Sequence, residues 1–259
     1  MKVKEIMATE VISVDKDVNL KQVLNLMKKY NITKIPVLEE KKLVGIITDN
    51  LIAYKLGSRR KREVTAAHLH ASSVIEKEFE IITPETDVKL LLQKVGEPGP
   101  TMLPVVENEK LIGVLTKADI LPLVKSTKQV QTIMQKTVFS VSSTDRVIHA
   151  RRIMIDNDVA RLPVVDQGEL AGMISDREIA FAFATLKRSF SLGRQKHQLD
   201  ELLVRDVMKT PVVWILSTMT VADAAKVMLK MNVGALPILK DEELVGIISR
   251  TDVLRTLSL

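Results

Sequence analysis

Four stretches of the sequence repeat one pattern, and this pattern decides the fold. In the last of them, Leu236-Pro237-Ile238 is followed by a short polar turn and then by Gly246-Ile247-Ile248-Ser249. The other copies read Ile35-Pro36-Val37 with Gly45-Ile46-Ile47-Thr48, Leu103-Pro104-Val105 with Gly113-Val114-Leu115-Thr116, and Leu162-Pro163-Val164 with Gly172-Met173-Ile174-Ser175. The proline and the glycine are 9 positions apart in every copy. A constant internal spacing at four places indicates a tandem structural repeat.

Two further markers keep the same register ahead of each proline. An apolar pair, whose second residue lies 29 positions before the proline, occurs as Ile6-Met7, Val74-Ile75, Ile133-Met134 and Val207-Met208. A single apolar residue lies 16 positions before the proline, as Leu20, Val88, Val147 and Val221. The steps between successive prolines are 68, 59 and 74 residues. Because the spacing within each copy is constant, the differences in length lie in the segments that connect one copy to the next.

Hydrophobic spacing predicts a strand, a helix, two strands and a second helix in each repeat. Leu20, Val23, Leu24 and Met27 recur every three or four residues, which is typical of an amphipathic helix. The runs 36–38 and 43–47 flank a short polar gap and predict a β-hairpin, and Gly168 supports such a turn in the third copy. Residues 11–14 predict the first strand and residues 117–121 a second helix. The expected fold class is therefore α/β (α+β), with four units of β-α-β-β-α type.

The composition bounds the class of protein. The chain has 259 residues, of which 46% are hydrophobic and only 3% aromatic, so we expect an aliphatic core. It contains no cysteine, no signal-peptide pattern and no apolar run near the roughly 18 residues that span a bilayer. We therefore expect a cytoplasmic protein without a membrane partner. The net charge of +6 weakly favours an anionic partner.

The repeats are expected to pair, because a single unit of about 50 residues has a marginal core. The short polar segment 126–129 marks the expected boundary between two pairs. The predicted repeats cover residues 1–56, 68–126, 127–186 and 200–259. The predicted pairs cover residues 1–126 and 127–259.

At these residues the chain resembles four tandem CBS domains, a family named for cystathionine beta-synthase. The resemblance covers nearly the whole chain. It implies that paired repeats pack through their sheets into a Bateman module, and that two modules form a disc. This arrangement is similar to that of stand-alone archaeal CBS proteins and of the gamma subunit of AMP-activated protein kinase. It also implies an adenosine-containing ligand in the cleft between paired repeats.

The ribose-binding motif of that family, Gly-apolar-apolar-Ser/Thr-x-x-Asp, is complete in two repeats. The second repeat ends it with Thr116 and Asp119, and the fourth with Ser249 and Asp252. The first repeat has Leu51 in place of the aspartate. The third has Ser175 and Glu178, whose occupancy by a ligand is left open. The same spacing is also that of a helix capping box, which needs no ligand.

The residue two positions before each proline alternates between a cation and an apolar side chain. Lys34 and Arg161 occupy this position in the first and third repeats, and Met102 and Ala235 in the others. The resemblance implies that Lys34 binds the phosphate of a nucleotide whose ribose is held by the second repeat, and that Arg161 does so for the fourth. Arginine can bind phosphate in a bidentate manner, so we expect the second module to hold it more firmly. The alternative is that both are solvated residues at a strand edge.

The adenine site is implied only by the resemblance. It would include Thr83, Pro84 and Val213 of the first strands, together with Met102 and Ala235. The alternative is that most of these are core residues. Trp214, the only tryptophan, is expected in the core close to this pocket.

The leading hypothesis is a sensor without catalytic activity that binds AMP, ADP or ATP as a regulatory ligand and needs no cofactor. It would signal to a second copy of the chain, as a homodimer, or to an unidentified regulated protein. Two alternatives remain open. Nucleic acid would contact the basic segments at Arg59, Arg60, Lys61 and Arg62 and at residues 187–197, although aromatic side chains are not interleaved there. An S-adenosylmethionine-type ligand carries a positive sulfur, which Lys34 and Arg161 disfavour.

Overall fold

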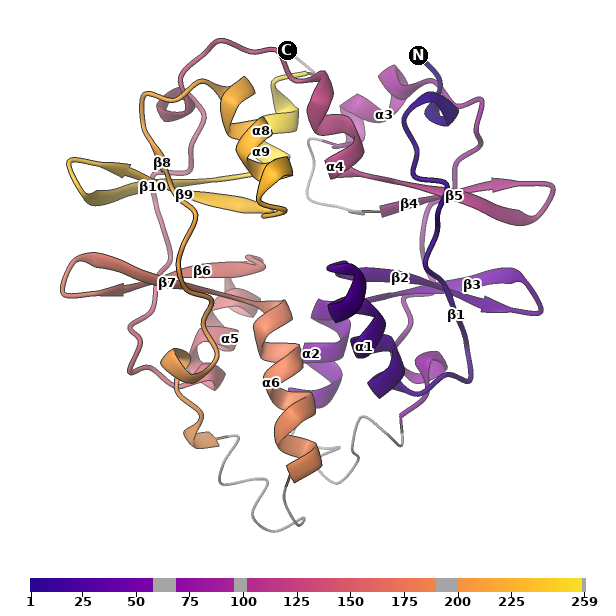
Figure 1. The fold of residues 1–259 in the computed structure, drawn as a ribbon, viewed down its shortest axis with the longest axis horizontal. Helices are drawn as coiled ribbons and strands as arrows, with labels where there is room; N and C mark the ends of the chain where they lie inside the picture. Colours follow the sequence, from indigo (N-terminus) through magenta and orange to yellow (C-terminus); the bar gives the residue numbers. More distant parts are fainter. Residues whose placement is uncertain (58–68, 96–101, 190–199, 258–259) are drawn as a thin grey trace. The chain divides into compact units, whose positions relative to one another are not determined.

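The computed structural model describes residues 1–57, 69–95, 102–189 and 200–257 (Figure 1). The basic segments 59–62 and 190–197 lie outside the described residues. The chain forms two compact units built from alternating stretches of sequence. Unit 1 consists of Met1–Val11, Phe79–Val138 and Val213–Leu259, and unit 2 of Ile12–Glu78 and Phe139–Val212.

Unit 2 holds the hairpins of the first and third repeats. The first repeat contributes β1 (Val14–Asp15), α1 (Leu20–Tyr30), β2 (Lys34–Glu39), β3 (Lys42–Thr48) and α2 (Asp49–Gly57). The third contributes α5 (Val147–Asp156), β6 (Arg161–Asp166), β7 (Glu169–Ser175) and α6 (Asp176–Ser189). The 3-10 helices η3 (Ala71–Val74) and η6 (Val204–Asp206) complete the unit. One sheet has the order β1-β2-β3, and β6 pairs with β7.

Unit 1 holds the hairpins of the second and fourth repeats. The second repeat contributes α3 (Val88–Val95), β4 (Met102–Glu107), β5 (Lys110–Thr116), α4 (Lys117–Ile120) and η4 (Leu121–Leu123). The fourth contributes β8 (Ile215–Leu216), α8 (Val221–Lys230), β9 (Ala235–Lys240), β10 (Glu243–Ser249) and α9 (Arg250–Arg255). The helices η1 (Val3–Glu5) and η5 (Val130–Thr132) also pack here. The sheets have the orders β10-β9-β8 and β4-β5.

The predicted order of elements is confirmed. In the first and fourth repeats a short strand pairs in parallel with the strand that carries the proline. In the second and third repeats this strand is reduced to single bridges, Ile82 with Val105 and Val141 with Val164. Each hairpin is antiparallel and has a register shift directly before its glycine, so the four copies share one irregularity.

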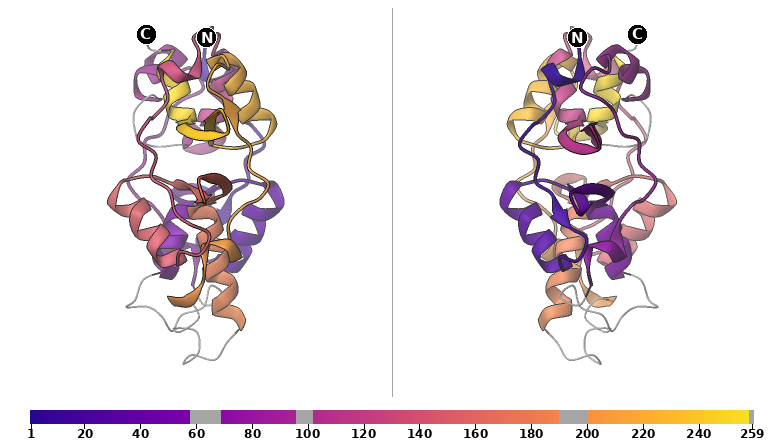
Figure 2. Two further views of the ribbon diagram at one scale, coloured as in Figure 1. Left: turned by 90° about the vertical axis from the view of Figure 1, so that its left-hand side faces the viewer. Right: turned by 90° about the vertical axis from the view of Figure 1, so that its right-hand side faces the viewer.

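Within each unit the helices cover one face of the two sheets (Figures 1 and 2). Helix α1 buries the four positions that the sequence spacing predicts, Leu20, Val23, Leu24 and Met27. Burying an aliphatic side chain of this size contributes about 1.5–3 kcal/mol, so these positions tie the helix to its sheet. The cores of both units are aliphatic, as the low aromatic content predicts.

The expectation for Trp214 is wrong. Its side chain is 48% exposed, whereas the next residue, Ile215, is buried. Successive side chains of a strand point to opposite faces, so burying Ile215 turns Trp214 and Leu216 outward.

The opening segment of each repeat packs against the hairpin glycine of its neighbour. A Cβ atom built on Gly113 would lie 2.8 Å from Sδ of Met7, and one on Gly45 would lie 2.9 Å from Cβ of Ile75. Gly246 meets Met134 and Gly172 meets Met208 in the same way. Reciprocal main-chain hydrogen bonds accompany each contact, such as those of 2.9 Å between Ala8 and Val114. Two of the repeated sequence markers, the apolar pair and the glycine, are therefore partners, and only glycine leaves room for the approach.

The β2–β3 turn offers a first test of local conformation. Glu40 and Lys41 both have positive φ, 48° and 69°, as a two-residue type I′ turn requires. The equivalent of Lys41 in the third repeat is Gly168, with φ 89° and no atom within 4 Å of a built Cβ. We expect Lys41→Gly to raise the free energy of unfolding by roughly 0.5–1 kcal/mol, since glycine adopts this conformation without steric cost. Urea unfolding measures the change. The reverse change, Gly168→Lys, should lower the free energy of unfolding. If both substitutions changed the free energy of unfolding in the same direction, the explanation would be wrong.

Candidate functional site

The first predicted ribose residue, Asp119, lies in the opening turn of α4. Its Oδ2 accepts hydrogen bonds of 2.7 Å from the main-chain N and from Oγ1 of Thr116. Thr116 in turn accepts a hydrogen bond of 3.2 Å from the main-chain N of Ala118. This is the capping box that the spacing allows. Among the described residues, the hydrogen bonds to Asp119 engage Oδ2 alone, so its Oδ1 is left to accept from another donor.

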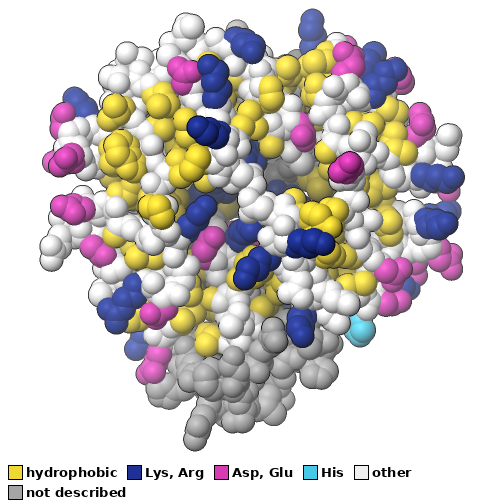
Figure 3. Space-filling model, viewed as in Figure 1, with side chains coloured by type: hydrophobic (Ala, Val, Ile, Leu, Met, Phe, Trp, Pro, Cys, Tyr) yellow, Lys and Arg dark blue, Asp and Glu magenta, His cyan; other side chains and the backbone are white. Residues whose placement is uncertain are grey.

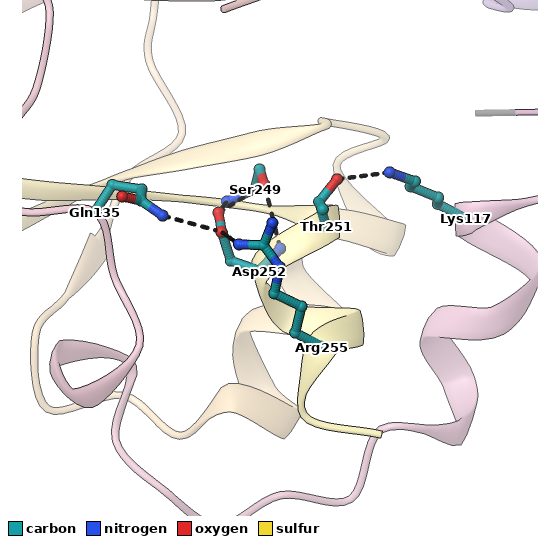
Figure 4. Close-up of polar contacts among 6 residues, drawn as sticks. All are labelled: Lys117, Gln135, Ser249, Thr251, Asp252 and Arg255. Atoms are coloured by element: carbon teal, nitrogen blue, oxygen red, sulfur yellow. Dashed lines mark hydrogen bonds and ion pairs between the residues drawn. The ribbon is translucent and has the colours of Figure 1, made fainter. Parts of the chain in front are cut away.

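The second predicted ribose residue, Asp252, is held by more partners (Figure 4). Its Oδ2 accepts hydrogen bonds from N and Oγ of Ser249, at 2.8 and 2.6 Å. Its Oδ1 accepts from Nε2 of Gln135 and from Nη1 of Arg255, each at 3.3 Å. Asp252 is only 8% exposed. A hydroxyl that reaches Oδ1 of Asp252 therefore has to compete with two donors, unlike one that reaches Asp119.

The other two repeats show how the motif changes. In the third repeat Glu178 accepts hydrogen bonds from both N and Oγ of Ser175, so its longer side chain accepts from the same two atoms of the preceding serine as Asp252 does. In the first repeat Thr48 accepts a hydrogen bond of 3.1 Å from the main-chain N of Leu51, and Leu51 supplies no carboxylate. The complete capping box is thus recorded in the second and fourth repeats, and the hydrogen bonds to the acid are present in the third as well.

A buried lysine lies between the second and fourth repeats in unit 1. Nζ of Lys117 donates a hydrogen bond of 2.6 Å to Oγ1 of Thr251 (Figure 4). Lys117 is 8% exposed, and burial lowers its pKa, with a further lowering from Arg255 and an opposing effect from Asp252. This contact links α4 to α9 through side chains that the sequence analysis did not select.

The two predicted phosphate ligands begin the hairpin strands of unit 2. Lys34 pairs with Thr48 across the β2–β3 ladder, and Arg161 pairs with Ser175 across β6–β7. Both side chains are partly buried. Asp119 and Asp252 belong to unit 1. Each predicted nucleotide site therefore draws residues from both units, and their assembly into one site stays a prediction.

Unit 2 also contains two carboxylates beside these cations. Asp49 and Asp176 are the first residues of α2 and α6, and Nδ2 of Asn50 donates a hydrogen bond of 2.9 Å to Oδ2 of Asp176. The pKa of Asp176 is raised to about 6, mainly by burial and to a lesser extent by Asp49, against the lowering effects of the Asn50 hydrogen bond, Arg151 and Arg161. Burial also raises the pKa of Asp49, against the effect of Lys34 and Arg161. We call Lys34, Asp49, Arg161 and Asp176 the unit 2 charge cluster.

Sequence reasoning missed these carboxylates although a signal was present. The residue directly after the motif's Ser or Thr is Asp49, Lys117, Asp176 and Arg250 in the four copies. This residue is acidic in the first and third repeats, which have a cation two positions before the proline, and it is basic in the second and fourth, which have an apolar residue there. Comparing every position of the repeat for charge, and not only those of the family motif, would have found it.

The predicted adenine residues all lie in unit 1. Met102 and Ala235 are buried, Pro84 is buried, and Thr83 is exposed. Thr83 and Thr86 hydrogen-bond each other, with a distance of 3.1 Å between their Oγ1 atoms, which closes a local turn. Val213 packs against the core of the unit.

Three further observations bear on the class of ligand and partner. Among the described residues, no group of three or more histidine or acidic side chains is arranged to hold a metal ion. No helix in the described part of the chain has the length and apolar character needed to cross a membrane. On the face drawn in Figure 3, cationic and acidic side chains are interspersed, and the described residues there form no extended basic patch.

Comparison with known proteins gives four matches to one family model. The model, described as CBS domain, matches residues 3–57, 71–126, 130–185 and 204–259. The uncharacterized protein MJ1404 of Methanocaldococcus jannaschii is 29% identical over 98% of this chain and 61% of its own length. A 33.4 kDa protein in the ribosomal RNA operon of Thermofilum pendens is 25% identical over 91% of this chain and 84% of its own length.

A solved structure shares the arrangement of elements. The crystal structure of protein MJ1225 from Methanocaldococcus jannaschii, a proposed archaeal homologue of g-AMPK, has a TM-score of 0.84 and 21% sequence identity. The similarity covers 99% of this chain and 100% of that one. At this identity the likeness shows the fold. Compared with MJ1404, the chain spans less than two thirds of the relative's length.

Proposed function

Because the chain belongs to the CBS-domain family, we propose that it is a regulatory protein that binds adenine nucleotides through residues of paired repeats. The observation that carries the proposal is the opening turn of α4, where Asp119 keeps one carboxylate oxygen available beside the Thr116 hydroxyl. A carboxylate accepts hydrogen bonds only, so it suits the vicinal hydroxyls of a ribose.

The proposed ligand is AMP, ADP or ATP, and each part of it has assigned residues. Asp119 and Asp252 accept hydrogen bonds from the ribose, beside Thr116 and Ser249. Lys34 and Arg161 bind phosphate. The adenine contacts are Thr83, Pro84 and Met102 for one nucleotide, and Val213 and Ala235 for the other.

The proposed pairs are residues 1–126 and 127–259. The exchange of opening segments supports this pairing, because Met7 contacts Gly113 while Ile75 contacts Gly45. The second half repeats the exchange between Met134 and Gly246 and between Met208 and Gly172. In each half, therefore, two repeats complete one another's hairpin.

Nucleotide binding would regulate by changing the packing of the paired repeats. A coupling free energy of about 1–3 kcal/mol between two sites is typical of such proteins and changes a partner's affinity about 5- to 150-fold. The receiver of the signal is proposed to be a second copy of the chain or a separate regulated protein. The protein itself is proposed to have no catalytic activity.

Titration calorimetry with AMP tests the assignment of the ribose acceptors. Asp119→Ala and Asp252→Ala should each weaken AMP binding at the affected site about 10- to 100-fold, the loss expected for hydrogen bonds to a charged group. Leu51→Ala should leave the affinity unchanged, because the first repeat has no acceptor there.

A matched control separates ribose binding from helix capping. Asp223 at the start of α8 accepts a hydrogen bond of 2.7 Å from Oγ1 of the N-cap residue Thr220 and has no assigned ligand. Asp223→Ala removes a hydrogen bond from an N-cap hydroxyl to an acid, as Asp119→Ala does, and should not change AMP binding. Absence of binding to the unsubstituted protein would refute the proposed function. Equal losses in Asp223→Ala and Asp119→Ala would show that capping alone explains the motif.

A further inference from the structure

The unit 2 charge cluster combines the proposed phosphate ligands with two carboxylates. Arg161 experiences Asp49, Glu178 and Asp176, each of which raises its pKa against the larger lowering caused by burial. Among the described residues, no carboxylate comes within ion-pair distance of the Arg161 guanidinium. The guanidinium is therefore balanced by nearby negative charge but is not tied to one partner.

Asp176 is the most enclosed member of the cluster, at 6% exposed. It faces Asp49 and Asn50 from α2, Arg151 from α5 and Arg161 from β6, with Arg177 next to it on α6. Asp49 adds its own charge and faces Lys34, Arg161 and Arg177. An anion that reaches Arg161 thus enters a site that already contains two partly or fully buried acidic groups.

Unit 1 shows that these acids are not demanded by the fold. The equivalent positions there carry Lys117 and Arg250 at the starts of α4 and α9, and the residues equivalent to Lys34 and Arg161 are Met102 and Ala235. The same helix–strand junction accepts either sign of charge. A function in the cluster therefore explains Asp49 and Asp176 better than a structural requirement does.

We infer that Asp49 and Asp176 determine ligand selectivity, making the phosphate sites at Lys34 and Arg161 prefer a nucleoside monophosphate to a triphosphate. The inference rests on the proposed function and specifies its ligand. The cation at each site offsets the charge of a monophosphate, whereas the extra phosphates of a triphosphate bring further negative charge toward the same carboxylates. Like charges repel strongly where water is excluded, so the longer ligand is penalised more.

The same geometry couples ligand binding to a proton. An anion bound at Arg161 adds negative charge beside Asp176, which offsets the lowering of the Asp176 pKa by the guanidinium. Anion binding therefore raises the pKa of Asp176 further. Since that pKa is already about 6, binding near neutral pH should be accompanied by proton uptake at Asp176.

The test is a calorimetric titration of AMP and of ATP, both without Mg²⁺, into the full chain and its Asp49→Asn and Asp176→Asn variants. The unsubstituted protein should bind AMP more tightly than ATP. Each variant should shift the ratio of the two dissociation constants toward ATP by about tenfold, the effect of removing one like charge from a poorly solvated site. Asn keeps the shape of Asp and can still accept the Asn50 hydrogen bond.

Asp156→Asn is the matched control, because it removes the same charge at the exposed end of α5, where Asp156 pairs with Arg152 at 3.5 Å. It should leave the AMP-to-ATP ratio unchanged. Repeating the AMP titration in buffers with different ionisation enthalpies gives the number of protons taken up. The number of protons taken up should be smaller in Asp176→Asn than in the unsubstituted protein. Any proton that AMP itself takes up contributes equally to both titrations and does not affect this difference.

The outcomes separate this inference from the proposed function. If neither nucleotide binds the unsubstituted protein, the proposed function fails. If AMP binds but neither the ratio nor the proton uptake changes in Asp176→Asn and Asp49→Asn, the proposed function stands and the selectivity role is overturned. A ratio that shifts equally in Asp156→Asn would assign the effect to net charge and also overturn it.

Discussion

Asp176→Asn should make the protein more stable at neutral pH, by roughly 2–3 kcal/mol. The folded-state pKa of Asp176 is raised from the ordinary value of 3.8 to about 6, because burial penalises the charged form. The folded protein therefore binds this proton more tightly than the unfolded chain does. Its stability falls as pH rises from about 4 to about 6, and the full cost remains above that range. Asparagine has the shape of the protonated acid and avoids the cost.

The measurement is urea unfolding of both proteins at several pH values between 4 and 7.5. The two free energies of unfolding should converge near pH 4 and separate as pH rises. A difference that does not vary with pH, or a variant that is less stable at pH 7.5, would show that the Asp176 carboxylate is not destabilised by its surroundings.

Asp166→Asn is the control with the opposite sign. Hydrogen bonds of 2.9 Å from N of Ser143 and 2.8 Å from Oγ of Ser142 stabilise the charged form of Asp166 and lower its pKa. Such a group adds stability above its unfolded pKa, and that stability is lost as pH falls through the folded pKa. Asp166→Asn should therefore destabilise the protein at neutral pH, and the difference should shrink toward low pH.

Gly45→Ala should be strongly destabilising, by about 1–3 kcal/mol, as expected for an added methyl group in a filled space. The new Cβ would lie 2.9 Å from the main-chain O of Glu76 and 2.9 Å from Cβ of Ile75. Neither atom can move without displacing the main chain. The hydrogen bonds of 2.8 and 3.0 Å between Ile46 and Glu76 hold that chain in place.

Gly172→Ala provides the comparison. The Cβ added at position 172 would lie 2.5 Å from Sδ of Met208, near the end of a flexible side chain. Met208 can change rotamer, so we expect a smaller loss of stability than in Gly45→Ala. Met208→Ala in the Gly172→Ala background should recover part of the space. Equal losses in the two glycine variants would mean that neighbour flexibility does not set the cost.

Local features of the fold could be predicted because they depend on residues close together in the sequence. The spacing in α1 identifies its buried side, and the two-residue turns follow from short polar gaps between apolar runs. The caps at Thr116 and Ser249 follow from a three-residue interval.

Features that depend on distant segments could not be predicted. Constant spacing shows that Met7 and Met134 are equivalent, but it does not say which glycine each one meets. The partners of Asp252 include Gln135, which lies far away in the chain. Similarly, the raised pKa of Asp176 arises because two repeats bury it together.

The exchange of opening segments has a consequence for the order in which the nascent chain folds. Met7 leaves the ribosome well before its partner Gly113, which is synthesised only near the end of the second repeat. Both contacts of the first half can then close before the second half emerges. The helix pairs α2–α6 and α4–α9 each need one element from the second half, and α9 is the last of the described elements. The order of synthesis therefore allows the two halves to form one after the other, whereas each compact unit of the folded protein contains segments of both halves.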